Sequence, residues 1–141
     1  MANYKKILVP LDSSKRTNYA LTEAINIAKR NNASIVALYV LPFSPLSYRD
    51  NIIAQEEMYK EAEKNLIKAK ETSKKNGVAL ETKILKGHPG ELISNFANQK
   101  KNKIDLIVIG SRDLGRLKEM FLGSVSNFVV HKSKVSTLVL K

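Results

Sequence analysis

The chain has 141 residues, of which 24 are Lys or Arg and 13 are Asp or Glu, giving a formal charge of +11. It has no Cys and only two His, which excludes disulfide frameworks, thiolate zinc sites, iron–sulfur clusters and cysteine nucleophiles. A chain of this length can bury roughly 68–70% of the surface that its unfolded form exposes, so we expect a single domain spanning residues 1–141. The positive charge favours anionic partners such as nucleotides, nucleic acid or acidic lipid without choosing among them.

Near the amino terminus, the apolar run Ile7–Leu11 is broken by Pro10 and closed by Asp12. It is too short for a signal-peptide core or a membrane span, so we expect a cytoplasmic protein with no membrane partner. The run instead predicts a buried strand. Ser13 and Ser14 then precede an apolar repeat at Ala20/Leu21, Ala24/Ile25 and Ala28, which predicts a helix whose first turn is capped by serine hydroxyls.

Four further apolar segments predict strands, and three more helical repeats lie between them. Ser34–Leu41 and Asp105–Ile109 are nearly continuous hydrophobic runs, typical of central parallel strands, whereas Val78–Leu85 alternates and predicts an edge strand. The last predicted strand is Val135–Leu140. The helical repeats are Tyr59, Ala62, Leu66 and Ala69, ended by Asn76-Gly77; Leu92/Ile93 and Phe96/Ala97, begun by Pro89; and Val125, Phe128 and Val129.

The alternation of strands and helices predicts an α/β fold with a doubly wound, five-stranded parallel sheet sandwiched by helices. Ligands of such sheets bind at the carboxyl ends of the strands. The segment after the fourth strand is the most unusual one there, because Gly110 ends a buried run and Gly123-Ser124 opens a helix. The amides of Val125 and Ser126, two serine hydroxyls and Arg112 could together hold a polyphosphate. On local sequence alone, a turn and a helix cap without any ligand are the more common role of such residues.

Familiar nucleotide and hydrolase motifs are absent. Gly110 and Gly115 have P-loop spacing, but the Lys and the Ser or Thr of that motif are missing. The turn after the first strand contains no glycine, which disfavours a dinucleotide-binding Rossmann enzyme, and there is no G-x-S-x-G elbow. No general base or nucleophile accompanies the candidate phosphate donors, so we expect no catalytic residues and at most slow, incidental ATP hydrolysis.

Taken together, the motifs resemble those of the universal stress proteins across essentially the whole chain. Nucleotide-binding members carry G-x2-G-x9-G-[S/T] after the fourth strand, and Gly110, Asp113 and Gly123-Ser124 reproduce this spacing with Asp in place of the second glycine. Ile7–Asp12 is similar to the first strand and its Asp, and Gly87-His88-Pro89 to the turn before the third helix. The resemblance implies an adenine nucleotide alpha-hydrolase-like fold, binding of ATP or AMP, Mg with a bound triphosphate, and a role in the stress response as a nucleotide-dependent switch.

The resemblance also implies which residues bind the nucleotide. Pro10 and Asp12 would lie near the ribose or the metal-bound phosphates, and the backbone at Val40 would meet adenine. Gly110, Arg112 and Asp113 would border ribose and phosphate. The residues implied to cradle the phosphates are Gly123, Ser124, Val125 and Ser126. From local sequence alone, Asp12 is equally well explained as a helix cap.

Asp113 leaves two functions open. A carboxylate beside a polyphosphate repels it, and a Cβ hinders close approach of the backbone, so binding could be weakened, shifted toward AMP, or lost. In the last case the protein would be a nucleotide-free dimeric interaction module. Dimerisation is expected because Val135–Leu140 would leave an open edge if it ended the sheet, and the resemblance implies a homodimer through this strand.

The remaining charged residues indicate no further site. The many lysines are interspersed with Glu61, Glu63 and Glu71 and lack interleaved aromatic residues, which favours a solvated surface over specific nucleic-acid recognition. Non-specific binding of nucleic acid and an alpha-hydrolase type of enzyme remain alternatives, testable by salt dependence and by turnover. His88 is expected in a solvent-facing turn and His131 near a helix end, neither at metal spacing.

Overall fold

The computed structural model describes residues 3–12, 15–41, 48–111 and 124–141, in which five parallel strands form one sheet. The strand order is β3-β2-β1-β4-β5. This confirms the predicted α/β class, the central position of the first, second and fourth strands, and the edge position of the third. The strands are β1 (Lys6–Leu11), β2 (Ser34–Leu41), β3 (Leu80–Lys86), β4 (Leu106–Gly110) and β5 (Thr137–Leu140).

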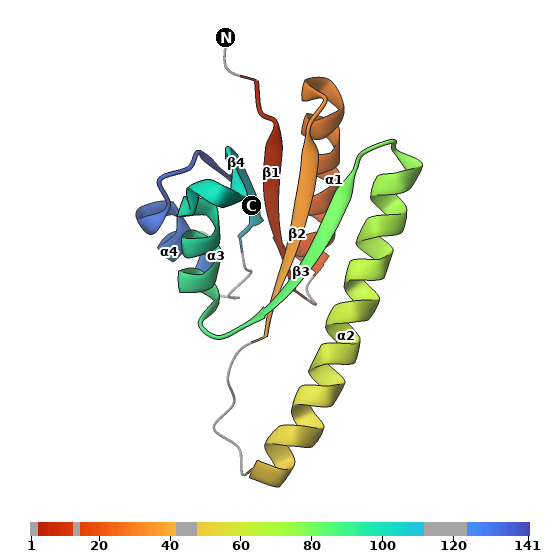
Figure 1. Cartoon of the computed structure of the whole chain (residues 1–141), viewed down its shortest axis with the longest axis vertical. Coiled ribbons are helices and arrows are strands. Elements are labelled where there is room, and N and C mark those ends of the chain that lie inside the picture. The colour runs from red at the N-terminus through yellow and green to blue at the C-terminus, as the bar shows by residue number, and fades with distance from the viewer. Residues whose placement is uncertain (1–2, 13–14, 42–47, 112–123) are drawn as a thin grey trace.

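Helices cover both faces of the sheet (Figure 1). The first pair, α1 (Lys15–Asn31) and α2 (Tyr48–Lys75), packs on one face, and α3 (Pro89–Asn98) and α4 (Ser124–Lys132) pack on the other. A short 3-10 helix, η1 (Lys100–Asn102), connects α3 to β4. The first turns of α2 extend past the carboxyl ends of the strands, at the lower end of Figure 1. No described helix combines the length and apolarity needed to span a membrane.

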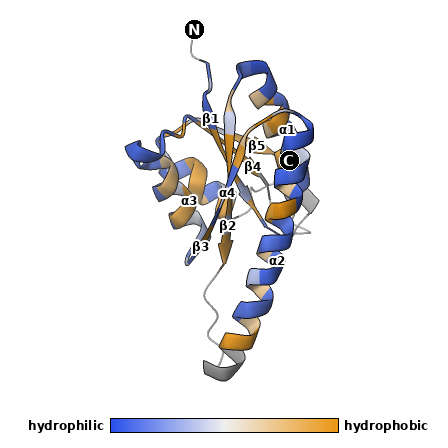
Figure 2. Cartoon of the chain, turned by 45° about the vertical axis from the view of Figure 1, so that its right-hand side comes forward, coloured by the Kyte–Doolittle hydropathy of each residue, from blue (hydrophilic) through white to orange (hydrophobic). Residues whose placement is uncertain are grey.

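The two core layers follow from the alternation of side chains along each strand. Ile7, Val9 and Leu11 of β1 face α1 and α2, whereas Leu8 between them faces α3 and α4. Because every second residue of a strand points to the opposite face, a strand covered on both sides must be apolar throughout. Each fully buried Leu, Ile or Val contributes about 1.5–3 kcal/mol of transfer free energy. In Figure 2 the helices accordingly turn hydrophobic faces toward the sheet and hydrophilic faces outward.

The predicted helix boundaries are largely confirmed. Gly77 has a φ of +71° directly after α2, as expected for the left-handed stop at Asn76-Gly77. Pro89 occupies the first position of α3, and the exposed His88 caps it by accepting a hydrogen bond at Nδ1 from the Glu91 N–H, at 3.4 Å. His131 lies in the last turn of α4, also exposed. The serines predicted to cap α1, Ser13 and Ser14, lie outside the described residues.

One residue of the predicted α2 repeat was placed wrongly. Ala62, Leu66 and Ala69 are buried as expected, but Tyr59 is 47% exposed. Met58, four residues before Ala62, packs against the core instead. Steps of three and of four residues both stay on one face of a helix, so the spacing alone did not decide between Met58 and Tyr59.

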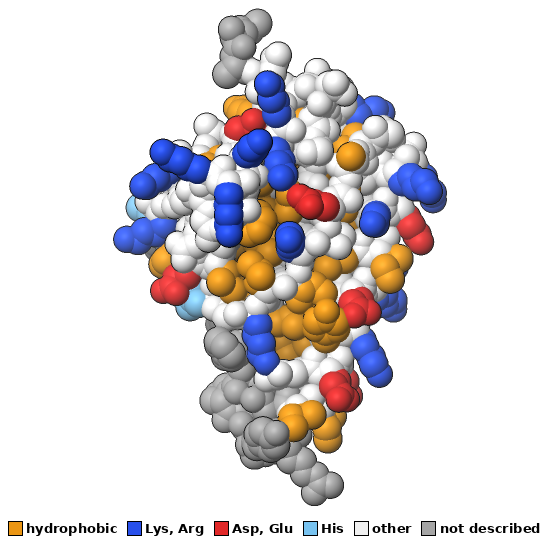
Figure 3. Space-filling model, viewed as in Figure 1, with side chains coloured by type: hydrophobic (Ala, Val, Ile, Leu, Met, Phe, Trp, Pro, Cys, Tyr) orange, Lys and Arg blue, Asp and Glu red, His pale blue; other side chains and the backbone are white. Residues whose placement is uncertain are grey.

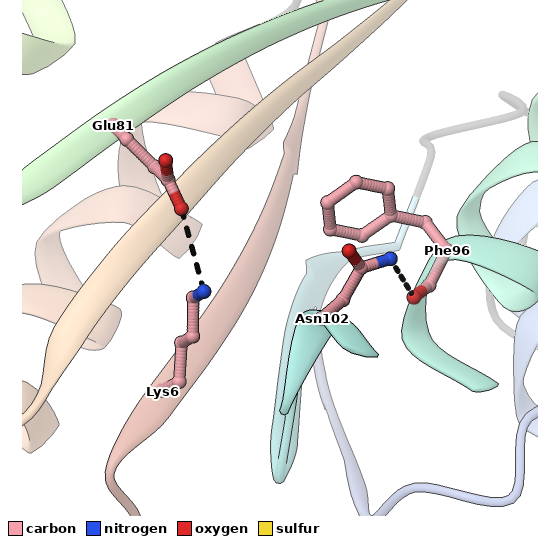
Figure 4. A network of polar contacts seen from close by, with 4 residues as sticks. All are labelled: Lys6, Glu81, Phe96 and Asn102. Atoms are coloured by element: carbon pink, nitrogen blue, oxygen red, sulfur yellow. Dashed lines mark hydrogen bonds and ion pairs between the residues drawn. The ribbon is translucent and has the colours of Figure 1, made fainter. Parts of the chain in front are cut away.

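Two polar contacts, drawn in Figure 4, join different elements of the structure. Lys6 of β1 reaches across β2 to Glu81 of β3, with 3.4 Å between Nζ and Oε1. Since Lys6 and Glu81 are 30% and 55% exposed, this ion pair contributes at most about 1 kcal/mol. Asn102 donates from Nδ2 to the Phe96 carbonyl oxygen at 2.8 Å, which joins η1 to α3.

Candidate functional site

A cavity of about 500 Å³ lies at the carboxyl ends of β1, β2 and β4. The sheet forms its floor, and α1, α2, α3 and α4 each contribute to its walls. This is the position at which parallel α/β sheets bind their ligands. The residues that line the cavity are Pro10, Leu11, Asp12, Thr17, Leu38, Tyr39, Val40, Leu41, Glu57, Met58, Glu61, Pro89, Ile93, Ile109, Gly110, Val125 and Ser126.

At the tip of β1, two side chains hold each other in place. The buried Thr17 hydroxyl donates to Oδ1 of Asp12 at 2.6 Å, and its oxygen accepts from the Asp12 backbone N–H at 3.0 Å. These two bonds connect the end of the strand to the first turn of α1. Asp12 is exposed, so its carboxylate is oriented by the protein while remaining accessible from the cavity.

The first turn of α4 forms the opposite wall. The helix begins at Ser124, as predicted, and Val125 and Ser126 line the cavity. Backbone N–H groups in a first helical turn have no partner within the helix, and the helix dipole favours negative charge there. Ser126 is 2% exposed and therefore fixed by its surroundings. This end of the cavity can accept an anionic oxygen.

The third wall comes from α2, through Glu57, Met58 and Glu61. Sequence reasoning did not single out these three residues. Their four-residue spacing places Glu57 and Glu61 on one helical face, which is readable from sequence. That this face borders a cavity depends on how α2 packs across β2 and β3, and the sequence gives no signal of that. In Figure 3 acidic side chains lie along α2 beside the exposed hydrophobic surface.

The structure brings together six of the ten residues predicted for nucleotide binding. Pro10, Asp12, Val40, Gly110, Val125 and Ser126 all line the cavity. Ser124 opens α4 but is not among the lining residues. Arg112, Asp113 and Gly123 lie outside the described residues.

The described ranges contain no group of three or more His, Asp or Glu residues arranged to hold a metal ion. Asp12 contributes a carboxylate and Thr17 a hydroxyl, both oxygen donors of the kind Mg²⁺ prefers, at the cavity wall.

A parallel sheet with a cavity at its strand tips, flanked by a helix N-terminus, is the α/β architecture in which small ligands typically bind at this position. The sequence profile described as the universal stress protein family matches residues 3–141. The chain therefore belongs to the universal stress protein family.

Individual relatives agree with this assignment. Universal stress protein MJ0531 of Methanocaldococcus jannaschii is 35% identical over 142 residues, which cover 98% of this chain and 82% of that protein. The solved structure of the universal stress protein UspA from Lactobacillus plantarum matches with a TM-score of 0.88 and 30% identity, covering 100% of both chains. A universal stress protein solved in complex with cAMP matches with a TM-score of 0.72 and 25% identity, over 99% of this chain and 98% of that one.

Proposed function

We propose that this protein binds an adenine nucleotide in the strand-tip cavity, with ATP as the leading ligand and AMP as the alternative. The carrying observation is that the cavity joins the largely apolar residues at the tip of β2 to the N-terminus of α4. The apolar residues can bind the base of a nucleotide, and the helix N-terminus can bind its phosphate. The universal stress protein solved with cAMP supports an adenylate as the ligand class.

In this proposal the phosphates lie against the amides of Val125 and Ser126, and the base meets the backbone at Val40. Asp12, oriented by Thr17, faces the ribose or the metal-bound phosphates. If the ligand is a triphosphate, Mg²⁺ would supply the positive charge that offsets the phosphate oxygens beside Asp12. Arg112, Asp113, Ser124 and Gly123 complete the proposed set of binding residues.

The proposed biological role is that of a cytoplasmic, nucleotide-dependent switch in the stress response. A ligand switches a protein only if it binds two conformations with different affinity. Residues 110–124, which connect β4 to α4, are the proposed element that ATP orders, and a partner or a second subunit would read the change. The protein would act as a homodimer through Val135–Leu140, with any ATP hydrolysis slow and incidental.

Isothermal titration with Mg-ATP, ADP and AMP tests the proposal, using Val125→Glu as the disrupting variant. Val125 is partly buried and lines the cavity, so a carboxylate there repels phosphate, and we expect affinity to fall more than tenfold. Asn127→Glu is the matched control, because it adds the same charge to an exposed position near the same end of α4, outside the cavity lining. An acidic residue near a helix N-terminus is compatible with the helix dipole, but Val125 also packs against the buried cluster on this face of the sheet, so circular dichroism should first establish that Val125→Glu is folded.

Binding by Val125→Glu equal to that of the unaltered protein would contradict the phosphate position. Undetectable binding by the unaltered protein at about 1 mM nucleotide, equivalent to an affinity weaker than about 4 kcal/mol, would favour the alternative of a nucleotide-free dimeric interaction module.

A further inference from the structure

The charged side chains of the cavity wall are unevenly placed. Among the described lining residues, Asp12, Glu57 and Glu61 are acidic and none is basic. Glu57 and Glu61 project from α2, whereas the anion-accepting amides belong to α4 on the opposite face of the sheet. The cavity therefore has one wall that accepts hydrogen bonds from a ligand and another that donates them.

Sheet order separates these two walls along the cavity. The α2 wall lies over the tip of β2, and the α4 wall adjoins the tip of β4, with β1 between them. Neighbouring strands are about 4.8 Å apart, so β2 and β4 are separated by roughly 10 Å. A nucleotide whose phosphate lies at α4 would therefore extend its base toward α2.

Both α2 carboxylates are available to a ligand. Glu57 and Glu61 are exposed, and neither forms an ion pair with another described residue. An ionised carboxylate accepts hydrogen bonds and donates none, and it repels a second anion. At this end of the cavity, the Glu57 and Glu61 carboxylates therefore favour a neutral ring that carries an N–H donor.

We infer that Glu57 and Glu61 accept hydrogen bonds from the exocyclic amino group of the bound base. They would then be specificity-determining residues that favour an amino-substituted purine nucleotide over the same nucleotide without the amino group. This inference rests on the proposed function, because it assigns roles within the same cavity. It assigns one N–H of the amino group to the carboxylates of α2 and leaves the other N–H for the backbone at Val40.

The test compares AMP with purine riboside 5′-monophosphate, which lacks the 6-amino group and is otherwise the same molecule. Affinities are measured by isothermal titration for the unaltered protein, for Glu57→Met, Glu61→Met and for the double variant. Methionine keeps the length and apolar stem of glutamate and removes the acceptor. Glu63→Met is the matched control, since Glu63 is exposed on the same helix and does not line the cavity.

We expect the unaltered protein and Glu63→Met to prefer AMP about tenfold, the effect of one hydrogen bond to a charged group. In the double variant the preference should fall to within about twofold. Binding of purine riboside 5′-monophosphate should stay constant or tighten, because two negative charges have been removed. Glu57→Gln/Glu61→Gln should restore part of the preference, because glutamine keeps a neutral acceptor oxygen.

Two results would overturn the inference while leaving the proposed function intact. One is equal binding of the two ligands by the unaltered protein. The other is a full preference for AMP in the double variant, which would leave the backbone at Val40 as the reader of the amino group. Failure of the unaltered protein to bind Mg-ATP as well as both monophosphates would instead overturn the proposed function, and this inference with it.

Discussion

At the scale of single residues, Thr17 has a structural role at the cavity that its place in the sequence does not indicate. Its hydroxyl is both a donor to the Asp12 carboxylate and an acceptor from the Asp12 N–H. The side chain is 8% exposed, so water cannot readily replace these bonds. One side-chain partner of Asp12 is the Thr17 hydroxyl in the first turn of α1, so the carboxylate contacts the start of that helix, where the local sequence also allowed a cap. That pairing orients the carboxylate toward the cavity.

Thr17→Val should destabilise the protein by about 1–2 kcal/mol. Valine has nearly the same shape but offers no hydroxyl, so the Asp12 N–H loses its acceptor and the carboxylate loses a donor. Urea unfolding followed by circular dichroism measures the change. Thr17→Ser, which retains the hydroxyl, should remain within about 1 kcal/mol of the unaltered protein. A loss from Thr17→Ser as large as that from Thr17→Val would show that the methyl group, and not the hydrogen bonds, is responsible.

At the scale of elements, the helices α3 and α4 approach each other closely at Gly90. A Cβ added to Gly90 would lie 2.8 Å from Cγ and from Cδ1 of Phe128. At the C-terminal end of α3, Asn98 donates to the carbonyl oxygen of Lys132 in α4 at 3.1 Å. Asn98 also accepts from the N–H of Lys134, just after α4, at 2.8 Å. The position of α4, and with it the position of its N-terminal amides at the cavity, therefore depends on the absence of a side chain at Gly90.

Gly90→Ala should destabilise the protein by about 1–3 kcal/mol, the usual cost of overpacking, in spite of the higher helix propensity of alanine. In the Phe128→Ala background the loss caused by Gly90→Ala should be smaller, because alanine lacks the Cγ and Cδ1 atoms that the new methyl group would meet. Urea unfolding of the two single variants and the double variant gives the coupling free energy.

Gly77→Ala serves as the control for the Gly90 experiment. Gly77 has a φ of +71° and nothing within 4 Å of an added Cβ, so its loss of about 1–2 kcal/mol comes from the left-handed backbone alone. It should show no coupling to Phe128→Ala. A stabilising Gly90→Ala, or equal coupling at both glycines, would contradict the proposed steric contact.

The elements also show what could be predicted from the sequence. Continuous apolar runs identified β1, β2 and β4, and the alternation of β3 identified an edge, because burial on one or both faces directly sets the residue pattern. Topology indicated the strand tips and Gly110 as the place of the site, whereas Pro10, Asp12 and Val40 were implied by the family resemblance. Glu57 and Glu61 were indicated by neither, because their role depends on where α2 ends up over β2, a consequence of packing between distant segments. Tyr59 was misplaced because a repeat of three or four residues does not determine the centre of the buried face.

At the scale of the whole molecule, the sheet ends in two different edges. β3 lies beside α2, whereas β5 is a short strand that pairs only with β4 among the described strands. Leu138 on β5 is 36% exposed, and Val130 on the neighbouring α4 is 41% exposed. An unpaired strand edge next to exposed apolar side chains favours association with another copy of the same edge. These features support the homodimer proposed through Val135–Leu140.

The dimer can be tested by sedimentation equilibrium. The unaltered protein should sediment as a dimer at about 50 µM, a concentration that populates interfaces of modest affinity. Leu138→Lys should shift it toward the 15.8 kDa monomer, because a charged side chain on an edge strand opposes strand pairing. Ile67→Lys is the matched control, since Ile67 is 58% exposed on α2, far along the sheet from β5. A monomeric unaltered protein, or dissociation caused equally by both lysines, would refute pairing through β5.

Because Leu138 is not among the cavity residues, the nucleotide affinity of the monomeric variant would show whether dimerisation and ligand binding are coupled. A switch that acts through the second subunit requires such coupling.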